Sequence, residues 1–399
     1  MLKFHARTDV GLKRKHNEDS LLAAEEFGVF VVADGVGGRK AGELASAITV
    51  NTFQGYAPQI RAGVEAFAAE NNRETRNAVL TLLDQAANAS SRRVYESAAA
   101  TGRQGMTTTL VAVAVGGGAA FVVHVGDSRA YLVRNAELRQ LTDDHSMVNE
   151  LIRRGEMTPE EALTSRYKNV ITRAVGLYPT VQTDTLHVEL LDGDRILLCS
   201  DGVTDMVPVP RILEHLIGAD LVASVDRLVV SALEGGGRDN ITAICIQPEA
   251  VLEAEAVVAR AKAMEGLFLF QDLPFHARLR VGQIVSELFV TPGQRIVKQG
   301  DLGDTLYVVV QGQFSILIDG KQFGELSQGS HFGEISLVDS SPRTADIVAN
   351  GFGHLLAIDR EGLRQYCTLE PALGNLMVWR LLQSVVGRLR SADEKLGKL

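Results

Sequence analysis

Residues 107–133 read TTTLVAVAVGGGAAFVVHVGDSRAYLV, and they contain the longest apolar stretch of the chain. Two apolar runs rich in Val, Phe and Tyr flank a cluster of three glycines, Gly116 to Gly118. The runs are shorter than the roughly 20 residues that a membrane helix needs. Because β-branched and aromatic residues favour strands and the glycines favour a turn, we predict a β-hairpin.

Other short runs of the same composition surround this hairpin. They are FGVFVVADG at 27–35, DRILLCSDG at 194–202 and NITAICIQP at 240–248. Residues 41–53 and 74–100 instead repeat apolar side chains at spacings of three and four, which predicts two amphipathic helices. Hairpins combined with such helices favour sheets that carry helices on their outer faces. We therefore expect an α+β fold.

The composition is that of an ordinary globular protein. The 399 residues carry 40 Lys and Arg against 49 Asp and Glu, a net charge of −9. No block of basic residues is present, so neither a nucleic-acid surface nor a membrane surface is expected. The amino terminus has no signal-peptide core, and three widely spaced cysteines fit a reducing compartment, so we expect a cytoplasmic protein.

The length predicts two or three domains, and the texture of the sequence changes at Pro248. An Ala- and Glu-rich segment follows and predicts a connecting helix. Short strands with Gly-containing turns come next and suggest a small β-barrel with flanking helices. We therefore expect a first domain, a connecting helix, a second domain and a C-terminal helix at residues 1–247, 248–266, 267–366 and 367–399.

The final helical pattern, at 371–396, places an apolar stripe on one face. The stripe consists of Leu376, Trp379, Leu382, Val386 and Leu389. It could cover the barrel, or it could form a homodimer with a second copy of the chain. An apolar residue of this helix could instead cap a ligand that is bound in the barrel. The sequence leaves these interpretations open.

Four acidic residues stand where predicted strands begin or end: Asp34, Asp127, Asp201 and Asp239. Each could be a simple turn residue. If the strand ends converge, however, the carboxylates repel one another unless divalent cations neutralise them. Oxygen ligands favour Mg²⁺ or Mn²⁺ over Zn²⁺. Two such ions could activate water for hydrolysis of a phosphomonoester.

RKHNED at 14–19 contains a guanidinium and two further carboxylates. Arg14 could clamp a phosphate beside the ions, although it could also be a surface charge of a basic cluster. The histidines near these motifs show no metal-like spacing and are interpreted as structural or solvated: His16, His124 and His145.

Six motifs occur in order between residues 14 and 242: RKHNED, DGVGGxxAGExAS, GMTTT, VGDSRAYL, SDGVTD and GGGRDNIT. Their order resembles the metal-dependent protein phosphatase (PPM) family, the type 2C serine/threonine phosphatases. The resemblance implies a four-layer α-β-β-α sandwich with metal ions at one end. It also implies a phosphoserine or phosphothreonine protein as substrate. Residues 143–163 resemble the family's flap, which influences substrate choice.

The resemblance implies a set of metal ligands for two, or with a third site three, Mn²⁺ or Mg²⁺ ions. Asp34 would bridge two ions, and the carbonyl of Gly35 would hold one of them. Asp201 and Asp239 would hold the other. Asp127 matches the residue that binds a third ion in bacterial members.

The same resemblance implies catalytic residues. Glu18 and Asp19 match residues that act largely through metal-bound water, and Arg14 matches the phosphate-binding arginine. Val36 and Arg39 stand where other members carry histidines. We therefore expect protonation of the leaving group to depend only weakly on any one side chain.

GSHFGEISLVDSSPRTADIVA at 329–349 predicts a ligand pocket. A helix that starts near Gly333 and Glu334 would direct backbone N–H groups at an anion, and Arg343 would add a bidentate contact. The Glu334 carboxylate suits hydroxyl groups instead. Phosphate and ribose together meet both demands, whereas a turn with a solvated Arg–Glu pair is the alternative.

Residues 267–366 as a whole resemble the cyclic nucleotide-binding domain. The resemblance implies that Glu334 binds the ribose 2′-hydroxyl and that Arg343 binds the cyclic phosphate. The remaining residues implied at the site are Gly333, Ser336 and Thr344. The nucleotide could be cAMP or cGMP, and cAMP is favoured by its breadth in the family.

Together these patterns predict a protein serine/threonine phosphatase that a cyclic nucleotide regulates. The alternative is a cyclic nucleotide-sensing scaffold that docks a phosphoprotein without hydrolysis, which only Val36 favours. Hydrolysis of small phosphoesters or of phosphoserine regulators shares the same metal chemistry, and the sequence does not separate it from the first prediction.

Overall fold

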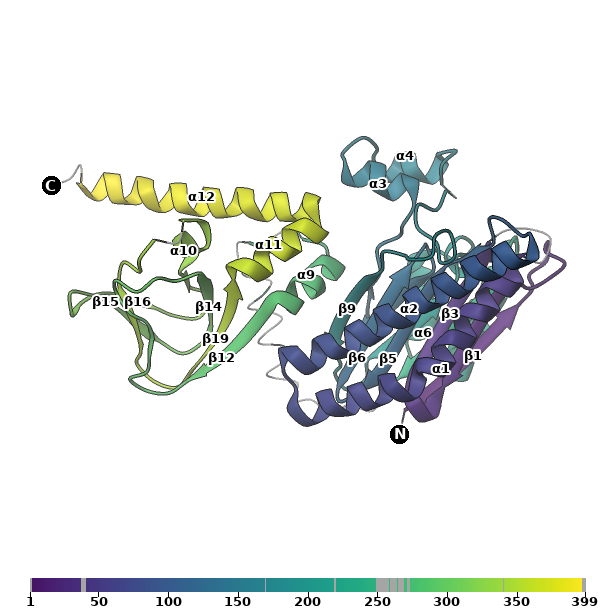
Figure 1. The fold of residues 1–399 in the computed structure, drawn as a ribbon, viewed down its shortest axis with the longest axis horizontal. Helices are drawn as coiled ribbons and strands as arrows, with labels where there is room; N and C mark the ends of the chain where they lie inside the picture. Colours follow the sequence, from purple (N-terminus) through teal and green to yellow (C-terminus); the bar gives the residue numbers. More distant parts are fainter. Residues whose placement is uncertain are drawn as a thin grey trace. The chain divides into compact units, whose positions relative to one another are not determined.

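The computed structural model describes residues 2–36, 41–168, 170–218, 220–248, 258, 264, 269–270, 273–339 and 341–396. The chain forms two compact units, Met1–Glu253 and Ala254–Leu399 (Figure 1). Arg39 and nearly all of the predicted connecting helix at 248–266 lie outside the described residues. The domain boundaries at 247, 266 and 366 stay predictions.

Two antiparallel sheets form the centre of the first unit. One has the order β2-β3-β5-β6-β9, with β4 paired to β3. Its strands are β2 (Asp19–Ala24), β3 (Val29–Val36), β4 (Thr107–Thr108), β5 (Leu110–Gly116), β6 (Ala119–Val125) and β9 (Asp184–Glu189). The other has the order β1-β11-β10-β7-β8. Its strands are β1 (Lys3–Asp9), β7 (Arg129–Arg134), β8 (Glu137–Gln140), β10 (Arg195–Cys199) and β11 (Ile241–Gln247). The predicted hairpin is β5 and β6.

The central strands are apolar throughout because both of their faces are buried. Successive side chains of a strand point to opposite faces. In β3, Val29 and Val31 belong to the core that the helices cover. Phe30 is equally buried, and its ring lies 5.2 Å from that of Phe4 on β1. The two sheets therefore pack face to face.

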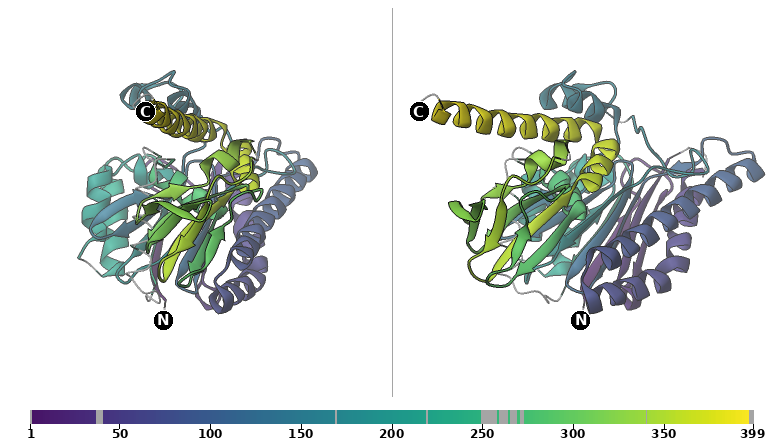
Figure 2. Two further views of the ribbon diagram at one scale, coloured as in Figure 1. Left: turned by 90° about the vertical axis from the view of Figure 1, so that its left-hand side faces the viewer. Right: turned by 60° about the vertical axis from the view of Figure 1, so that its left-hand side comes forward.

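Helices cover both outer faces, as the left view of Figure 2 shows. The helices of this unit are α1 (Ala41–Glu70), α2 (Arg73–Thr101), α3 (Met147–Arg153), α4 (Pro159–Thr164), α5 (Asp201–Thr204), α6 (Val209–Leu216) and α7 (Leu221–Glu234), with a 3-10 turn η1 (Glu25–Phe27). α1 and α2 pack on the first sheet, and α6 and α7 on the second. The predicted α-β-β-α sandwich is confirmed.

The second unit is a small β-barrel, as predicted. Its two sheets have the orders β12-β19-β14-β17 and β13-β18-β15-β16. The strands are β12 (Val285–Val290), β13 (Arg295–Val297), β14 (Thr305–Gln311), β15 (Phe314–Ile318), β16 (Lys321–Leu326), β17 (His331–Phe332), β18 (Asp346–Ala349) and β19 (Gly353–Asp359). The helical segments are α9 (Phe275–Val281), η2 (Gly282–Ile284), α10 (Glu334–Asp339), α11 (Arg360–Leu369) and α12 (Pro371–Leu396).

The apolar stripe of α12 does not cover the barrel. Met377 and Leu381 of α12 are almost fully buried in the core that α9, α11 and the barrel strands share. The predicted stripe lies on another side of the helix, where Trp379 is 60% exposed and Leu389 is 61% exposed. The interpretation that the stripe covers the barrel is therefore wrong.

No described helix combines the length and apolar character needed to cross a membrane.

Candidate functional site

Strand ends bring the predicted carboxylates of the first unit together. Asp19, at the start of β2, lies opposite Asp34 on β3, and the charges of Asp19 and Asp201 act on the Asp34 carboxyl group. Asp201 begins α5 directly after β10. Asp127 follows β6, and Asp239 precedes β11; their charges act on the same group of side chains. The strand ends therefore bring these acidic residues near one another, and their assignment as metal ligands stays a prediction.

Hydroxyl groups orient the Asp19 carboxylate. Its Oδ2 accepts hydrogen bonds from Ser200 Oγ (2.8 Å) and Thr242 Oγ1 (2.6 Å). Its Oδ1 is buried and has no hydrogen-bond partner among the described residues, and the same holds for Oδ1 of Asp201. Ser200 and Thr242 are not among the predicted site residues, although they belong to the motifs SDGVTD and GGGRDNIT.

Burial and mutual repulsion favour the protonated carboxyl groups in this arrangement. Burial raises the pKa of Asp19 to about 6, and burial together with the charge of Asp144 raises the pKa of Asp127 to about 6. Burial and then the charges of Asp127 and Asp239 raise the pKa of Asp201 to about 8. Burial, followed by the neighbouring carboxylates, holds the pKa of Asp34 well above its ordinary range.

These shifts predict an unusual pH dependence for the metal-free protein. A carboxyl group whose folded pKa exceeds its unfolded value of about 3.9 stabilises the fold as pH falls through the folded pKa. The free energy of unfolding should therefore rise as pH is lowered from about 8.5 toward 5. Thermal melts with chelator, compared with excess Mg²⁺, check this result, because ions bind the deprotonated groups and should reverse the trend.

Asp201→Asn provides the control for that experiment, since it removes the group with a pKa of about 8. The melting temperature of the metal-free variant should depend less on pH between pH 7 and 8.5 than that of the wild type. A metal-free melting temperature that increases with pH across the window would contradict the account.

The carboxylate cluster fits divalent cations. Its donors are oxygen atoms, two of them buried without a hydrogen-bond partner in the described ranges, and hard ions prefer such ligands. Within the part of the chain that the structure describes, no three acidic, histidine or cysteine side chains could hold an ion by themselves. Backbone carbonyls and water would have to complete any coordination shell.

Close backbone packing fixes the position of Asp34 and Gly35. The Asp34 carbonyl accepts from Thr108 Oγ1 (2.8 Å), and the Asp34 N–H donates to Thr109 Oγ1 (2.9 Å). A side chain at Gly35 would place its Cβ only 2.2 Å from the carbonyl oxygen of Gly42 at the start of α1. The GMTTT and AGE motifs thus hold the end of β3, a role that the sequence alone did not reveal.

Arg14 and the loop that carries it are tied to the segment before β11. Arg14 Nη2 donates to Asp239 Oδ2 at 2.7 Å, and this hydrogen bond raises the pKa of Arg14. The Asn240 amide donates to the carbonyl of His16 (2.9 Å) and accepts from the N–H of Glu18 (2.8 Å). Asn240, which was not among the predicted site residues, therefore positions the RKHNED loop.

Two of the three histidines near the site are buried. His124 and His145 are each 1% exposed, and their rings lie 4.7 Å apart. His145 Nδ1 accepts from the N–H of Gly126 at 3.1 Å, next to Asp127. The His16 side chain is exposed. These positions agree with the interpretation of the histidines as structural or solvated. Val36, at the end of β3, is 41% exposed.

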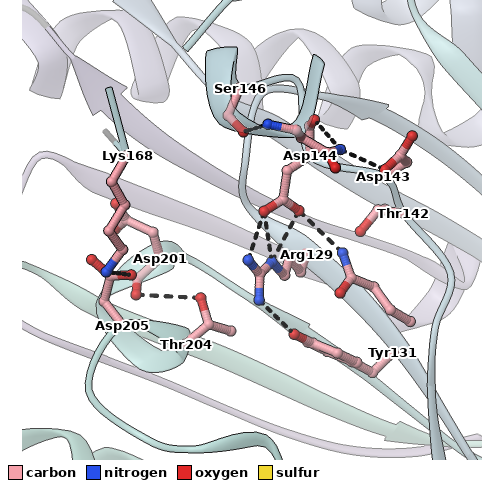
Figure 3. Close-up of polar contacts among 12 residues, drawn as sticks. Arg129, Tyr131, Thr142, Asp143, Asp144, Ser146, Lys168, Asp201, Thr204 and Asp205 are labelled. Carbon is pink, nitrogen blue, oxygen red and sulfur yellow. Dashed lines mark hydrogen bonds and ion pairs between the residues drawn. The ribbon is translucent and has the colours of Figure 1, made fainter. Parts of the chain in front are cut away.

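An ion pair beside Asp127 anchors the predicted flap, which contains α3 and α4. Figure 3 shows the Arg129 guanidinium facing Asp144, with Nη2 to Oδ2 at 2.6 Å, while Nη1 donates to Tyr131 Oη at 3.1 Å. Asn149 of α3 donates to Asp143 Oδ1 at 2.6 Å. The flap therefore begins at residues that also set the electrostatics of Asp127.

In the second unit, the predicted nucleotide residues surround the start of α10. Arg343 is 8% exposed; its Nη1 donates to Ser336 Oγ (3.1 Å) and its Nη2 to the carbonyl of Thr305 (2.9 Å). Glu334, the first residue of α10, is 1% exposed. Gly333 has φ of +87° and leaves no room for a Cβ, which would lie 2.5 Å from Arg343 Nη1. Burial lowers the pKa of Arg343.

Not every predicted nucleotide residue lies within this group. Thr344 is on an exposed bend after Arg343. The structure adds Tyr307, whose ring centroid lies 6.0 Å from the Arg343 guanidinium carbon. It also adds Arg360, which donates to the Leu337 carbonyl of α10 at 3.0 Å. No local sequence signal indicates these contacts, because they join residues far apart in the chain.

Comparisons with known proteins agree with both units. The sequence model of protein phosphatase 2C matches residues 13–234, more than half of the chain. The model of the cyclic nucleotide-binding domain matches residues 287–369. The chain belongs to the protein phosphatase 2C family and carries a cyclic nucleotide-binding domain.

Individual relatives cover the first unit. The serine/threonine protein phosphatase PstP of Mycobacterium tuberculosis is 37% identical over 245 residues, which are 61% of this chain but only 44% of PstP. The serine/threonine phosphatase Stp of Listeria monocytogenes is 36% identical, and the match spans 60% of this chain and 94% of Stp. This chain thus spans less than half of the length of PstP and nearly all of Stp.

Two solved structures of PstP are also similar to this chain. The crystal structure of M. tuberculosis PstP is similar with a TM-score of 0.56 at 36% identity and covers 62% of this chain and 99% of the PstP chain. The catalytic domain of PstP in complex with two manganese ions has a TM-score of 0.52 at 36% identity, over 62% of this chain and 97% of that one.

Proposed function

We propose that this protein is a metal-dependent phosphatase that hydrolyses phosphoserine and phosphothreonine in proteins. The observation that carries the proposal is the cluster of Asp19, Asp34 and Asp201, with Asp239 and its partner Arg14 at the edge. The named activities of PstP and Stp support it. A scaffold without hydrolysis has no need of a cluster whose charges repel one another.

We assign each residue a role in this reaction. Asp34, the Gly35 carbonyl, Asp201 and Asp239 would hold two Mn²⁺ or Mg²⁺ ions, and Asp127 a third. Bound ions supply an activated water nucleophile and neutralise developing negative charge. Glu18 and Asp19 would accept hydrogen bonds from water that the ions hold.

Arg14 binds the substrate phosphate in this proposal. It is 48% exposed and already lies at the edge of the cluster, paired with Asp239. If Asp239 holds an ion, the Arg14 guanidinium would be available for a bidentate contact with phosphate oxygens. Protonation of the leaving alkoxide falls to water, because His124 and His145 are buried away from solvent.

The test of this activity is phosphate release from matched peptides that carry phosphoserine, phosphothreonine or phosphotyrosine. We expect turnover of the first two with Mn²⁺ and none after chelation with EDTA, restored by added Mn²⁺. Turnover of none of the peptides, or turnover that EDTA leaves intact, would contradict the proposal.

We also propose that the second unit binds cAMP or cGMP and thereby regulates the phosphatase. The buried Arg343 and Glu334 at the start of α10 support the pocket, since together they suit a phosphate and a ribose hydroxyl. A ligand that binds only the folded state raises the melting temperature. Melting curves with each nucleotide should show such an increase for one or both, with 5′-AMP as the control. Equal curves in all samples would exclude the binding site.

The exposed stripe of α12 supports a homodimer. From Trp379 its residues follow spacings of three, four and three, which suits packing against a second copy of the same helix. Light scattering should give the mass of two chains for the wild type and of one for the Trp379→Glu, Leu382→Glu variant. A single-chain mass for the wild type at micromolar concentration would exclude this dimer.

The free cysteines support the expected cytoplasmic location.

A further inference from the structure

A pocket of about 460 Å³ opens beside the carboxylate cluster of the first unit. Three segments line it: the segment that follows the flap, with Arg166 and Lys168; α5 and the residue after it, with Asp201 and Asp205; and the loop before β11, with Arg238 and Asp239. Figure 3 shows Lys168 next to Asp205 and Asp201. Asp201 and Asp239 are proposed metal ligands, so one wall of the pocket belongs to the phosphatase site.

The charges of this pocket do not balance one another when ions are bound. Lys168 Nζ pairs with Asp205 at 3.1 Å. Asp239 pairs with Arg14, and both Asp239 and Asp201 are assigned to metal ions. Arg166 and Arg238 are exposed and form no ion pair within the described residues. Two exposed guanidinium groups of the pocket lining therefore supply uncompensated positive charge.

The Arg166 side chain is also held in place. Its guanidinium carbon lies 4.7 Å from the ring centroid of Tyr167, and its Nη2 contacts the Tyr167 hydroxyl group. A stacked guanidinium keeps most of its N–H donors for another partner, and such donors match the oxygen pairs of phosphate and carboxylate groups. The pocket is therefore suited to an anion, and it lies next to the proposed site of phosphate hydrolysis.

We propose that Arg166 and Arg238 bind a second anionic side chain of the phosphoprotein substrate, close in sequence to the residue that is dephosphorylated. This inference rests on the proposed phosphatase function and specifies its substrate class. Extended residues rise by about 3.3 Å each, so a side chain two positions away lies about 7 Å along the same face. The second anion is either a phosphorylated residue or an Asp or Glu, and both provide the oxygen pair.

The experiment compares kcat/KM for phosphate release from phosphothreonine peptides that differ at one position. That position, two residues before or two residues after the phosphothreonine, carries Ala, Glu or a non-hydrolysable phosphonate analogue of phosphoserine. With Mn²⁺ present, the wild type should prefer the anionic peptides about tenfold in at least one register. A preference for phosphonate alone identifies a phosphorylated neighbour, whereas equal preference for Glu identifies acidic sequences.

Variants separate the pocket from general electrostatics. In the double variant Arg166→Ala, Arg238→Ala the ratio of kcat/KM for the anionic peptide to kcat/KM for the Ala peptide should fall to about one. The double variant Arg166→Lys, Arg238→Lys should keep most of this preference. Arg211→Ala replaces an exposed arginine of α6 that is paired with Glu214, and it should keep the full preference.

Two results would overturn the inference: a wild-type ratio near one in both registers, or a tenfold ratio that persists in the double alanine variant. Absence of release from every peptide, the Ala peptide included, would contradict the phosphatase proposal itself and this inference with it. Release without preference contradicts only the inference.

Discussion

Replacement of Asp34 by Asn is expected to lower phosphate release by at least about a thousandfold, which corresponds to ~4 kcal/mol in the activation barrier. The charges of Asp19, Asp201 and Asp127 act on the Asp34 carboxyl group, and we propose that Asp34 would help to hold both ions. An amide would bring no negative charge to them. The measurement is Mn²⁺-dependent kcat/KM on a phosphothreonine peptide, with calorimetric titration of Mn²⁺ into the same protein.

The same substitution should stabilise the metal-free protein. Burial and the charges of Asp19, Asp201 and Asp127 disfavour ionised Asp34, so Asn removes repulsion and should raise the melting temperature in EDTA by about 2–4 °C. Asp226→Asn is the matched control, because Asp226 lies on α7 and pairs with Arg7 outside the cluster. An Asp34→Asn protein that retains a tenth of the wild-type activity would refute the assigned role.

The second large effect is expected for Arg343→Ala, which should weaken cyclic nucleotide binding by about a hundredfold, or ~2.7 kcal/mol. Arg343 is buried. Its guanidinium donates hydrogen bonds to Ser336 of α10 and to the carbonyl of Thr305 at the start of β14. The variant removes the charge-assisted contact with the cyclic phosphate. Calorimetric titration of cAMP and cGMP measures the change directly.

Arg364→Ala is a suitable control for that titration, because Arg364 is an exposed arginine of α11. It should bind nucleotide as the wild type does. If Arg343→Ala binds within threefold of the wild type, the pocket at α10 is not the nucleotide site.

The carboxylate cluster could be predicted because each acidic residue follows or precedes a run whose strand character is plain in the sequence. Asp34 and Asp201 are examples, and the structure places them close enough for their charges to interact. The residues that hold them could not be found in this way. Asn240 and Thr109 act through contacts with segments far apart in the chain, and only the folded sheets bring these together.

Two helices show where local patterns mislead. The predicted helix covers residues 41–53 only, and Gly55 and Pro58, which often break helices, follow it. Burial of Ile60, Val64 and Phe67 against the first sheet nevertheless extends α1 to Glu70. In α12 the apolar stripe was correctly placed on one face of a helix, but the periodicity alone does not say which face contacts the barrel. Met377 and Leu381 do so instead.

We propose that cyclic nucleotide binding changes the activity of the phosphatase. The measurement is the rate of Mn²⁺-dependent phosphate release from a phosphothreonine peptide by the full chain, titrated with cAMP and, separately, with cGMP. Coupling between two sites typically amounts to about 5- to 150-fold. We predict a saturable change of at least about fivefold in kcat/KM with one nucleotide. Saturable binding of both nucleotides without any change in rate would contradict the account.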